Sequence, residues 1–352
     1  MEGVKRIMYQ GCSMIRAFAL NFNGRINTDR KCLTLCCEPI DDLPASTLED
    51  TPQETIERFI EMCSNVIKES KEHAAHENAG KRLHTTGCAN CANYIPGQWD
   101  GDGLIHYINL SMYPAPCQSK CIYCGVHSGE SGRFTKETCS AAYEQMFDAL
   151  DYARKKGLIA PGAFWQVSSG EIAIHPYRER IFNLVADQRA TFFTNCFIFD
   201  EKVAENLSKN PNSAINFSID AGTPQTWLKV KNVDNFKEVT ENLAKYFGAS
   251  SGPGQITLKY IILPGINDNM IDFLSVIGIM KVLRIKYLTI ARDTSKKYEV
   301  TSEESNKLLN AAAYLLAMLY RKDISADMFT YTPNEREKVV ALANELLHTG
   351  KV

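Results

Sequence analysis

Three cysteines, Cys117, Cys121 and Cys124, lie within eight consecutive residues. The gaps of three and two residues between them let one loop fold its thiolates around a single metal corner, as iron–sulfur ligation requires. The number of cysteines is informative. Four protein ligands close a structural metal site, whereas three leave one position open to a substrate or cofactor. A zinc site is the alternative. It would need a fourth ligand, for which His127 is the only nearby candidate.

Apart from Cys63, which falls inside a helical pattern, six further cysteines lie in the first hundred residues: Cys12, Cys32, Cys36, Cys37, Cys88 and Cys91. Four thiolates saturate a [4Fe-4S] cluster, so four of these six could hold a second, fully ligated cluster. Structural zinc is again the alternative, because a four-cysteine site with a Cys-x-x-Cys half suits that metal equally well.

The elements that position the first three cysteines alternate between strand and helix. Short apolar or β-branched runs predict strands over 106–111, 163–168, 190–194, 214–219, 256–263 and 286–290. Helical patterns lie between them, the clearest over 135–156. Alternating units of this kind require parallel strands with right-handed crossovers. We therefore expect an α/β fold, a partial (β/α)6 TIM-like barrel over residues 104–352, with a doubly wound sheet as the alternative.

Residues 1–103 follow a different pattern, which predicts a cysteine-rich N-terminal module. The expected elements are a hairpin over 13–35 around an Asn23-Gly24 turn, a polar linker over 41–52, a helix over 54–77 and a loop over 80–103. The sequence thus predicts two domains, 1–103 and 104–352.

Composition and charge exclude several classes of partner. The chain has 39 basic and 41 acidic residues, so no net positive field attracts nucleic acid or anionic lipid. The first twenty residues lack the unbroken apolar run of a secretion signal, and no segment has the length of a membrane span. In a reducing cytosol, clustered cysteines act as ligands more often than as disulfides. We expect a cytoplasmic protein that binds neither nucleic acid nor membranes.

The cysteine triplet, with Tyr123 before its last member, resembles the CxxxCxΦC motif of the radical S-adenosylmethionine (radical SAM) superfamily. The resemblance extends from residue 104 to the C-terminus. Ser168-Ser169-Gly170-Glu171 is similar to the GGEP segment that binds the SAM amino group, with Ser169 in place of the first glycine and Ile172 in place of the proline. Ser218-Ile219-Asp220 resembles the segment that reaches the SAM ribose or carboxylate. Lys259 and residues 263–268 resemble the fifth strand and its loop, near the adenine.

The resemblance implies a [4Fe-4S] cluster on the three cysteines and SAM bound by Tyr123, Ser169, Gly170, Glu171, Ser218, Asp220 and Lys259. One electron from the cluster would cleave SAM, and the resulting 5′-deoxyadenosyl radical would abstract hydrogen from a substrate at the barrel mouth. The resemblance to the radical SAM superfamily also implies an electron donor such as flavodoxin or ferredoxin.

The N-terminal cysteines partly resemble the auxiliary-cluster modules, named SPASM or Twitch, of many radical SAM enzymes. The match consists of Cys12, the hairpin with Gly24, Cys32 and a distant Cys-x-x-Cys. Those modules normally follow the barrel, and the seven-residue gap between Gly24 and Cys32 is longer than theirs. The choice of ligands among Cys32, Cys36 and Cys37 therefore stays open, and a second [4Fe-4S] cluster is expected.

Cys196 follows Thr194-Asn195, where the family usually has Thr-Asn-Gly. Some radical SAM epimerases and lyases use a cysteine thiol to quench a substrate radical, so Cys196 is the candidate hydrogen donor. A small buried thiol in place of glycine is the alternative. With the donor, the reaction would be an epimerisation, and without it an oxidation.

The function expected from the sequence is a radical SAM enzyme that acts on a small polar metabolite or sugar derivative. A peptide-modifying radical SAM maturase is the second hypothesis. A non-catalytic zinc or iron–sulfur scaffold is the hypothesis from another class.

Overall fold

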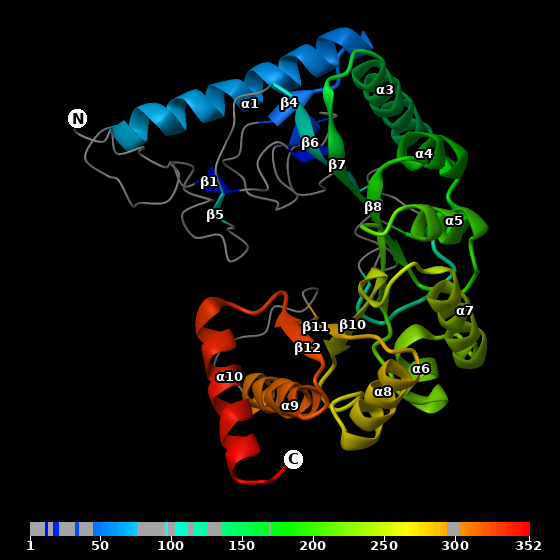
Figure 1. Cartoon of the computed structure of the whole chain (residues 1–352), viewed down its shortest axis with the longest axis vertical. Helices are drawn as coiled ribbons and strands as arrows, with labels where there is room; N and C mark the ends of the chain where they lie inside the picture. The colour runs from blue at the N-terminus through cyan, green and yellow to red at the C-terminus, as the bar shows by residue number, and fades with distance from the viewer. Residues whose placement is uncertain are drawn as a thin grey trace. The chain divides into compact units, whose positions relative to one another are not determined.

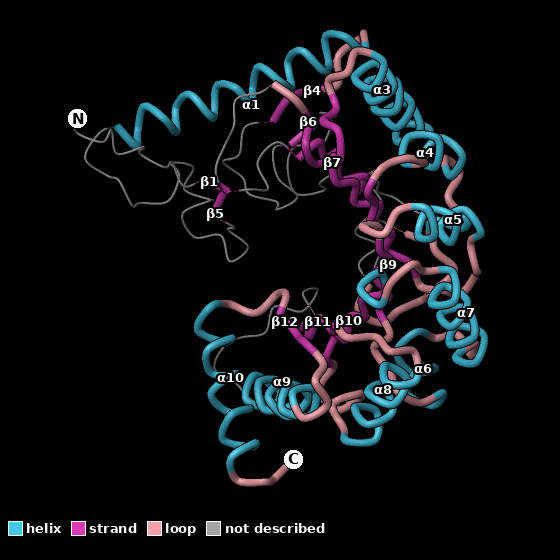
Figure 2. The backbone as a smooth tube through the Cα atoms, viewed as in Figure 1, coloured by secondary structure: helices cyan, strands magenta, loops and turns pink. Residues whose placement is uncertain are grey.

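The computed structural model describes residues 11–12, 17–20, 32–34, 45–75, 96–97, 103–111, 116–124, 136–168, 170–293 and 303–352. The chain divides into two compact units. The first comprises Met1–Pro114, Gly132–Ser169 and Asn183–Gln188, and the second comprises Ala115–Ser131, Gly170–Phe182 and Arg189–Val352. Figure 1 labels helices and strands of both units, and Figure 2 colours them by type.

The first unit contains a mixed sheet with the strand order β7-β6-β2-β3-β4. Its strands are β2 (Ala17–Leu20), β3 (Cys32–Thr34), β4 (Ala45–Thr47), β6 (Ile105–Ser111) and β7 (Ile159–Ser168). β6 runs parallel to both β2 and β7, whereas β3 is antiparallel to β2 and β4. A separate antiparallel pair joins β1 (Gly11–Cys12) to β5 (Pro96–Gly97).

The pairing of β2 with β3 confirms strand pairing within the predicted hairpin, with Ala19 opposite Thr34. The expectation of a linker over 41–52 is wrong at its centre, because β4 extends the sheet by pairing with β3. Leu33 and Ser46 face each other in this pairing and both are buried, so strand pairing outweighs the polar composition of the segment. The Asn23-Gly24 turn and most of the predicted loop over 80–103 lie outside the described residues.

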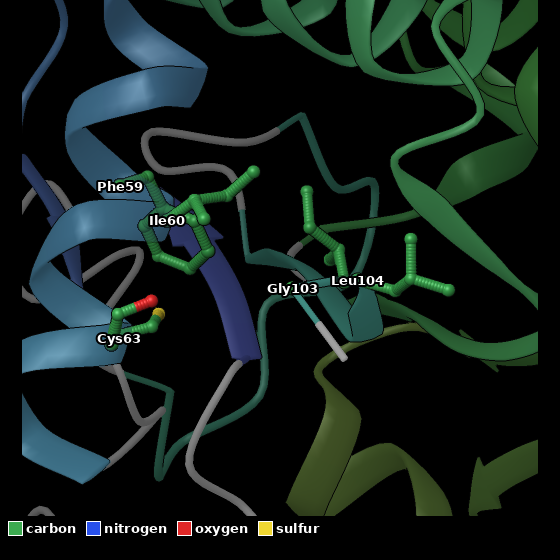
Figure 3. Close-up of a pocket in the computed structure, with 7 residues that line it drawn as sticks. Phe59, Ile60, Cys63, Gly103 and Leu104 are labelled. Atoms are coloured by element: carbon green, nitrogen blue, oxygen red, sulfur yellow. The ribbon is translucent and has the colours of Figure 1, made fainter. Parts of the chain in front are cut away.

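Two long helices belong to the first unit. α1 (Pro52–Ala75) and α3 (Lys136–Lys155) confirm the helices predicted over 54–77 and 135–156. The Thr51 hydroxyl accepts a hydrogen bond from the Glu54 amide at the start of α1, which satisfies one free donor of the first turn. The apolar side of α1 includes Phe59 and Cys63, which line a small pocket together with Leu104 at the start of β6 (Figure 3).

The second unit contains strands in the order β12-β11-β10-β9-β8. They are β8 (Arg189–Thr194), β9 (Ala214–Ser218), β10 (Ile256–Ile262), β11 (Tyr287–Arg292) and β12 (Ser325–Met328), and each runs parallel to its neighbours in this order. Helices and 3-10 turns alternate with them: η1 (Ile172–Ile174), α4 (Arg178–Val185), α5 (Glu201–Lys209), α6 (Pro224–Lys231), α7 (Phe236–Ala249), η2 (Pro253–Gln255), α8 (Met270–Val282), α9 (Glu303–Tyr320) and α10 (Pro333–His348).

All six predicted strands are present, as β6 to β11, and the helices fall between them. The prediction of an α/β fold with the strand and helix order of a partial (β/α)6 TIM-like barrel is confirmed. β12 was not predicted.

The sheet of the second unit has two chemically different faces. Alternate residues such as Phe217, Leu258, Tyr260 and Leu288 are fully buried, and Tyr260 packs edge-on against Phe273 of α8. This apolar face carries the helices. The residues between them on the strands are polar: Asn216 lies opposite Thr257, Ser218 opposite Lys259, Lys259 opposite Thr289, and Thr289 opposite Asp327. We call this set the polar face.

Local signals explain where several helices begin. Asp200 caps α5 by accepting from the Lys202 and Val203 amides, and Thr223 caps α6, where Pro224 occupies the first turn. At the start of α10, Thr332 and Glu335 form a capping box, in which each side chain accepts a hydrogen bond from the backbone amide of the other residue. Within the described part of the chain, no helix combines the length and the apolar character that a membrane crossing needs.

Candidate active site

The cysteine loop, residues 116–124, is fixed to the end of α6 by main-chain hydrogen bonds. The Lys120 amide donates to the Lys231 carbonyl at 3.1 Å, and the Ile122 amide donates to the Val230 carbonyl at 3.0 Å. Within the loop, the Cys124 amide donates to the Cys121 carbonyl. The backbone that carries the cysteines thus takes its course largely from α6.

Polar donors reach two of the three sulfurs. The Ser119 hydroxyl lies 2.8 Å from Cys121 Sγ, and Asn195 Nδ2 donates to Cys117 Sγ at 3.5 Å. Burial raises the pKa of the Cys117 thiol, and the hydrogen bond from Asn195 opposes that shift. All three cysteines are partly exposed. Hydrogen bonds to sulfur favour thiolates, so this donor set fits iron–sulfur ligation.

Among the described residues, no three His, Cys, Asp or Glu side chains converge closely enough to bind one metal ion. A [4Fe-4S] cluster does not require such convergence, because each thiolate binds a different iron. The loop supplies three thiols, two of them with polar groups at their sulfurs, which fits a cluster of that kind. His127, the candidate fourth zinc ligand, lies outside the described residues.

Glu171 is completely buried and joins three segments near the cysteines. Its amide donates to the Pro116 carbonyl, and its carboxylate accepts from the Thr194 hydroxyl at 2.9 Å and the Asn195 amide at 2.6 Å. Burial raises the pKa of this carboxyl to about 7, against the opposing hydrogen bonds. Glu171 therefore ties the end of β8 to the cysteine loop, and its predicted contact with SAM stays a prediction.

Asp220 is also completely buried, in a left-handed backbone conformation with φ 44°. Its Oδ1 accepts from the Ile261 amide at 2.6 Å, and its Oδ2 accepts from Tyr123 at 2.5 Å and from Lys231 Nζ at 2.6 Å. The Asn267 side chain donates to its carbonyl. The two predicted SAM-binding residues Tyr123 and Asp220 are thus brought into direct contact with each other.

Ser218 and Lys259 remain partly exposed, side by side on the polar face. The Lys259 ammonium makes no hydrogen bond or ion pair within the described residues, and burial lowers its pKa, with Lys231 adding to the effect and Asp220 opposing it. Ile261, two residues further along β10, packs with Ala291 and Tyr123 in one apolar cluster. The cysteine loop therefore lies on the same face of the sheet as Lys259.

Gly170 adopts a left-handed conformation with φ 63°, which suits glycine at a segment where backbone approaches a ligand. Ser169, the residue before it in the predicted SAM-binding segment, lies outside the described residues.

Cys196 has no exposed surface and a left-handed conformation with φ 57°. Its amide donates to the Thr194 hydroxyl, and its carbonyl accepts from Asn242 Nδ2 at 3.0 Å. Burial raises the pKa of the thiol well above its ordinary value. The conformation explains why the family has glycine here. The role of Cys196 as a hydrogen donor stays a prediction.

Two of the six cysteines proposed for the auxiliary cluster fall in described elements. Cys12 lies in β1 and Cys32 lies in β3. Cys36, Cys37, Cys88 and Cys91 lie outside the described residues, so the predicted auxiliary cluster is not tested by the structure.

Sequence reasoning missed Lys231 and the side-chain roles of Ser119 and Asn195. Lys231 ends a helix that also carries the exposed Lys229, and nothing in the sequence distinguishes the two. Asn195 belongs to the noted Thr-Asn-Cys segment, which could have indicated a contact at the strand end.

The fold and the site together define a class of protein. It is an α/β protein in which a loop with three cysteines lies on the polar face of a parallel sheet. Residues 116–276 match the family model of the Radical SAM superfamily. Residues 116–276 therefore form a radical SAM domain, as the sequence motifs predicted. The family implies a [4Fe-4S] cluster and SAM as cofactors.

Curated relatives include two proteins named GTP 3',8-cyclase. The one from Petrotoga mobilis is 22% identical over 191 residues, which cover 52% of this chain and 55% of the relative. The one from Desulforamulus reducens is 24% identical over 169 residues, which cover 47% of this chain and 49% of the relative. The chain thus spans about half the length of the curated relatives it matches.

Solved structures with a similar chain course include Streptococcus suis SuiB bound to S-adenosylmethionine, with a TM-score of 0.48 and 11% identity, covering 79% of this chain and 57% of SuiB. Another is a radical SAM methyltransferase from Sphaerobacter thermophilus, with a TM-score of 0.41 and 15% identity, covering 61% of this chain and 63% of that one.

Proposed function

We propose that this protein reductively cleaves SAM at a [4Fe-4S] cluster on Cys117, Cys121 and Cys124 and removes hydrogen from a small polar metabolite or sugar derivative. The observation that carries the proposal is the location of the cysteine loop on the polar face, beside the Lys259 ammonium, which has no hydrogen-bond or ion-pair partner among the described residues.

When bound, the cluster and SAM supply a 5′-deoxyadenosyl radical. The chain's own residues hold and orient the reactants. Gly170 offers backbone without a side chain, and Ser218 and Lys259 offer a hydroxyl and a cation on the polar face. The Lys259 ammonium suits the SAM carboxylate. Glu171 and Asp220 have no exposed surface and act by holding the strand ends and the loop in place.

The polar face supports a polar substrate. In an α/β fold the inner face of a barrel is commonly filled with branched apolar side chains. Here two neighbouring rows of that face carry amide, hydroxyl, ammonium and carboxylate groups. The buried Asn216 Oδ1 has no hydrogen-bond partner among the described residues, and a ligand with N–H or O–H groups would satisfy it.

GTP is the first substrate to test, because the curated relatives carry the name GTP 3',8-cyclase. It also lies within the proposed class, as a small polar metabolite that contains a sugar. The choice between epimerisation and oxidation depends on Cys196, which would return a hydrogen atom to the substrate in the first case. An auxiliary [4Fe-4S] cluster on four of the six N-terminal cysteines would accept the electron in the second.

The proposed partners are the small-molecule substrate and an electron donor such as flavodoxin or ferredoxin, without nucleic acid or membrane. We also propose a cytoplasmic location, because the reducing conditions of the cytoplasm keep clustered thiols available as ligands.

Metal analysis tests the cofactors. Anaerobic reconstitution should yield a brown protein with roughly eight irons per chain if both clusters form, and roughly four if only the first forms. Dithionite and SAM should then give 5′-deoxyadenosine, and the combined change of Cys117, Cys121 and Cys124 to Ala should abolish it. Zinc without iron would favour the scaffold hypothesis, and formation of 5′-deoxyadenosine by the triple variant would refute the site.

Deuterium transfer identifies the substrate class. A deuterated GTP, sugar or other polar metabolite that passes deuterium into 5′-deoxyadenosine would support the proposal. Transfer from a peptide alone would favour the maturase hypothesis.

A further inference from the structure

Lys231, Asp220 and Tyr123 form a closed triangle in the interior of the second unit. Lys231 Nζ donates to Asp220 Oδ2 at 2.6 Å and to the Tyr123 hydroxyl at 2.7 Å, and that hydroxyl donates to Asp220 Oδ2. The side chains of Lys231 and Asp220 are 3% and 0% exposed. Removing one member of a buried ion pair leaves the other charge buried alone, which is strongly unfavourable, so we expect the two side chains to stay in this arrangement.

The triangle includes a residue of the cysteine loop. Tyr123 stands between Cys121 and Cys124, and the Lys231 ammonium lies over its ring at 5.2 Å from the centroid. On the other side, the same ammonium lies 5.3 Å from the centroid of the Trp227 ring. The cation therefore contacts both the loop and α6 through aromatic faces.

The main chain continues the same attachment. Lys231 also accepts a hydrogen bond from the Lys120 amide through its carbonyl, and the neighbouring Asn232 side chain donates to the Lys120 carbonyl at 2.9 Å. Asn232 ends α6 in the left-handed conformation, with φ 53°. The C-terminal end of α6 thus holds the cysteine loop through the Lys231 carbonyl, the Asn232 side-chain amide and the Lys231 ammonium.

We propose that Lys231 is a positioning residue for the iron–sulfur loop: through Tyr123 and Asp220 it fixes the three cysteines in place before iron binds, and its charge raises the reduction potential of the cluster. The inference rests on the proposed function, since it assumes a cluster at this loop. Neither the cysteine motif nor the SAM-binding segments contain Lys231.

Thiol accessibility of the full-length apoprotein tests the first half of the proposal without a cofactor. Lys231→Met removes the ammonium, Tyr123→Phe removes only the hydroxyl, and Lys229→Met on the exposed side of α6 is the matched control. Alkylation of Cys117, Cys121 and Cys124, followed by mass spectrometry, should be about tenfold faster in Lys231→Met and less accelerated in Tyr123→Phe, because the loop opens more often. Lys229→Met should match the wild type.

Equal alkylation rates in Lys231→Met and Lys229→Met would overturn the proposal. Should Lys231→Met fail to fold by circular dichroism, Tyr123→Phe decides, because it retains the ion pair. In that case, wild-type rates in Tyr123→Phe would overturn the proposal.

The cluster potential tests the second half by the sign of the shift. Removing a positive charge disfavours the reduced cluster and removing a negative charge favours it. After reconstitution, EPR-monitored titration should give a lower midpoint potential in Lys231→Met and a higher one in Asp220→Asn. Shifts in the same direction would indicate a packing effect and contradict the electrostatic role. A wild type that binds no iron at this loop would instead refute the proposed function, which separates the two failures.

Discussion

Asn195 Nδ2 donates a hydrogen bond to Cys117 Sγ at 3.5 Å, while the Asn195 main-chain amide donates to the buried carboxylate of Glu171. One residue directly after β8 thus contacts both the first cysteine of the loop and the acid that fixes the strand end. The chemistry proposed for the thiolates depends on this junction.

Changing Asn195 to Ala should make the cluster harder to reduce. Hydrogen bonds to cluster sulfurs stabilise the reduced state, so the midpoint potential should fall and SAM cleavage should slow. The lost side-chain bonds should also lower the free energy of unfolding by about 1 kcal/mol. Asn212→Ala, at an exposed position, is the control. A potential equal to that of the control would contradict a functional contact with Cys117.

Glu171 should make stability depend on pH. Its pKa is about 7 in the folded protein against a reference of 4.5, so folding favours the protonated form. The contribution of Glu171 to the free energy of unfolding is fully present below pH 4.5 and is lost as the pH rises through about 7. The free energy of unfolding should fall over this window by up to about 3 kcal/mol on account of Glu171.

Urea unfolding at several pH values checks this dependence. Glu171→Gln should flatten the slope between pH 4.5 and 7, whereas Glu238→Gln, at an exposed position of α7, should leave it as in the wild type. An unchanged slope in Glu171→Gln would show that other groups produce the dependence.

Lys259→Met should weaken SAM binding. If the ammonium pairs with the SAM carboxylate, losing that charge-assisted bond costs about 1.5–3 kcal/mol, or roughly a 10- to 100-fold rise in Kd. Calorimetric titration of SAM into the anaerobic, cluster-loaded protein measures it. Lys281→Met, on the exposed side of α8, is the matched control. Unaltered affinity in Lys259→Met would remove this residue from the SAM site.

Cys196 should resist alkylation in the folded apoprotein, because its thiol has no exposed surface. Cys117, Cys121 and Cys124, which are partly exposed, should react first, and Cys196 should react only after urea unfolding. Peptide mapping of alkylated protein distinguishes the two classes. Rapid labelling of Cys196 would show that its surroundings open readily, as a hydrogen donor to substrate would require.

The strands of the barrel were predictable because each is an apolar or β-branched run bounded by a helix. β12 escaped prediction because Ser325-Ala326-Asp327-Met328 has no such run, and it forms by pairing with β11. β4 escaped for a similar reason, since Ala45-Ser46-Thr47 lies in a polar segment and pairs with β3. In both cases a neighbouring strand supplies what the local sequence lacks.

The site was predictable where its residues follow one another in sequence, as in the cysteine loop. It was not predictable where distant residues meet. Lys231 and Tyr123 are 108 positions apart, and their contact depends on how α6 ends beside the loop. The burial of Glu171 and Asp220 was equally hidden, because a carboxylate in a ligand-binding motif gives no sign that protein donors already surround it.

The attachment of the cysteine loop through the carbonyls of Val230 and Lys231 has an evolutionary consequence. Carbonyl groups are common to all amino acids, so the outer residues of α6 can diverge freely among descendants while the loop keeps its course. Lys231 is the exception, since its side chain also takes part. Its replacement would have to be accompanied by a change at Asp220, and the two positions should vary together.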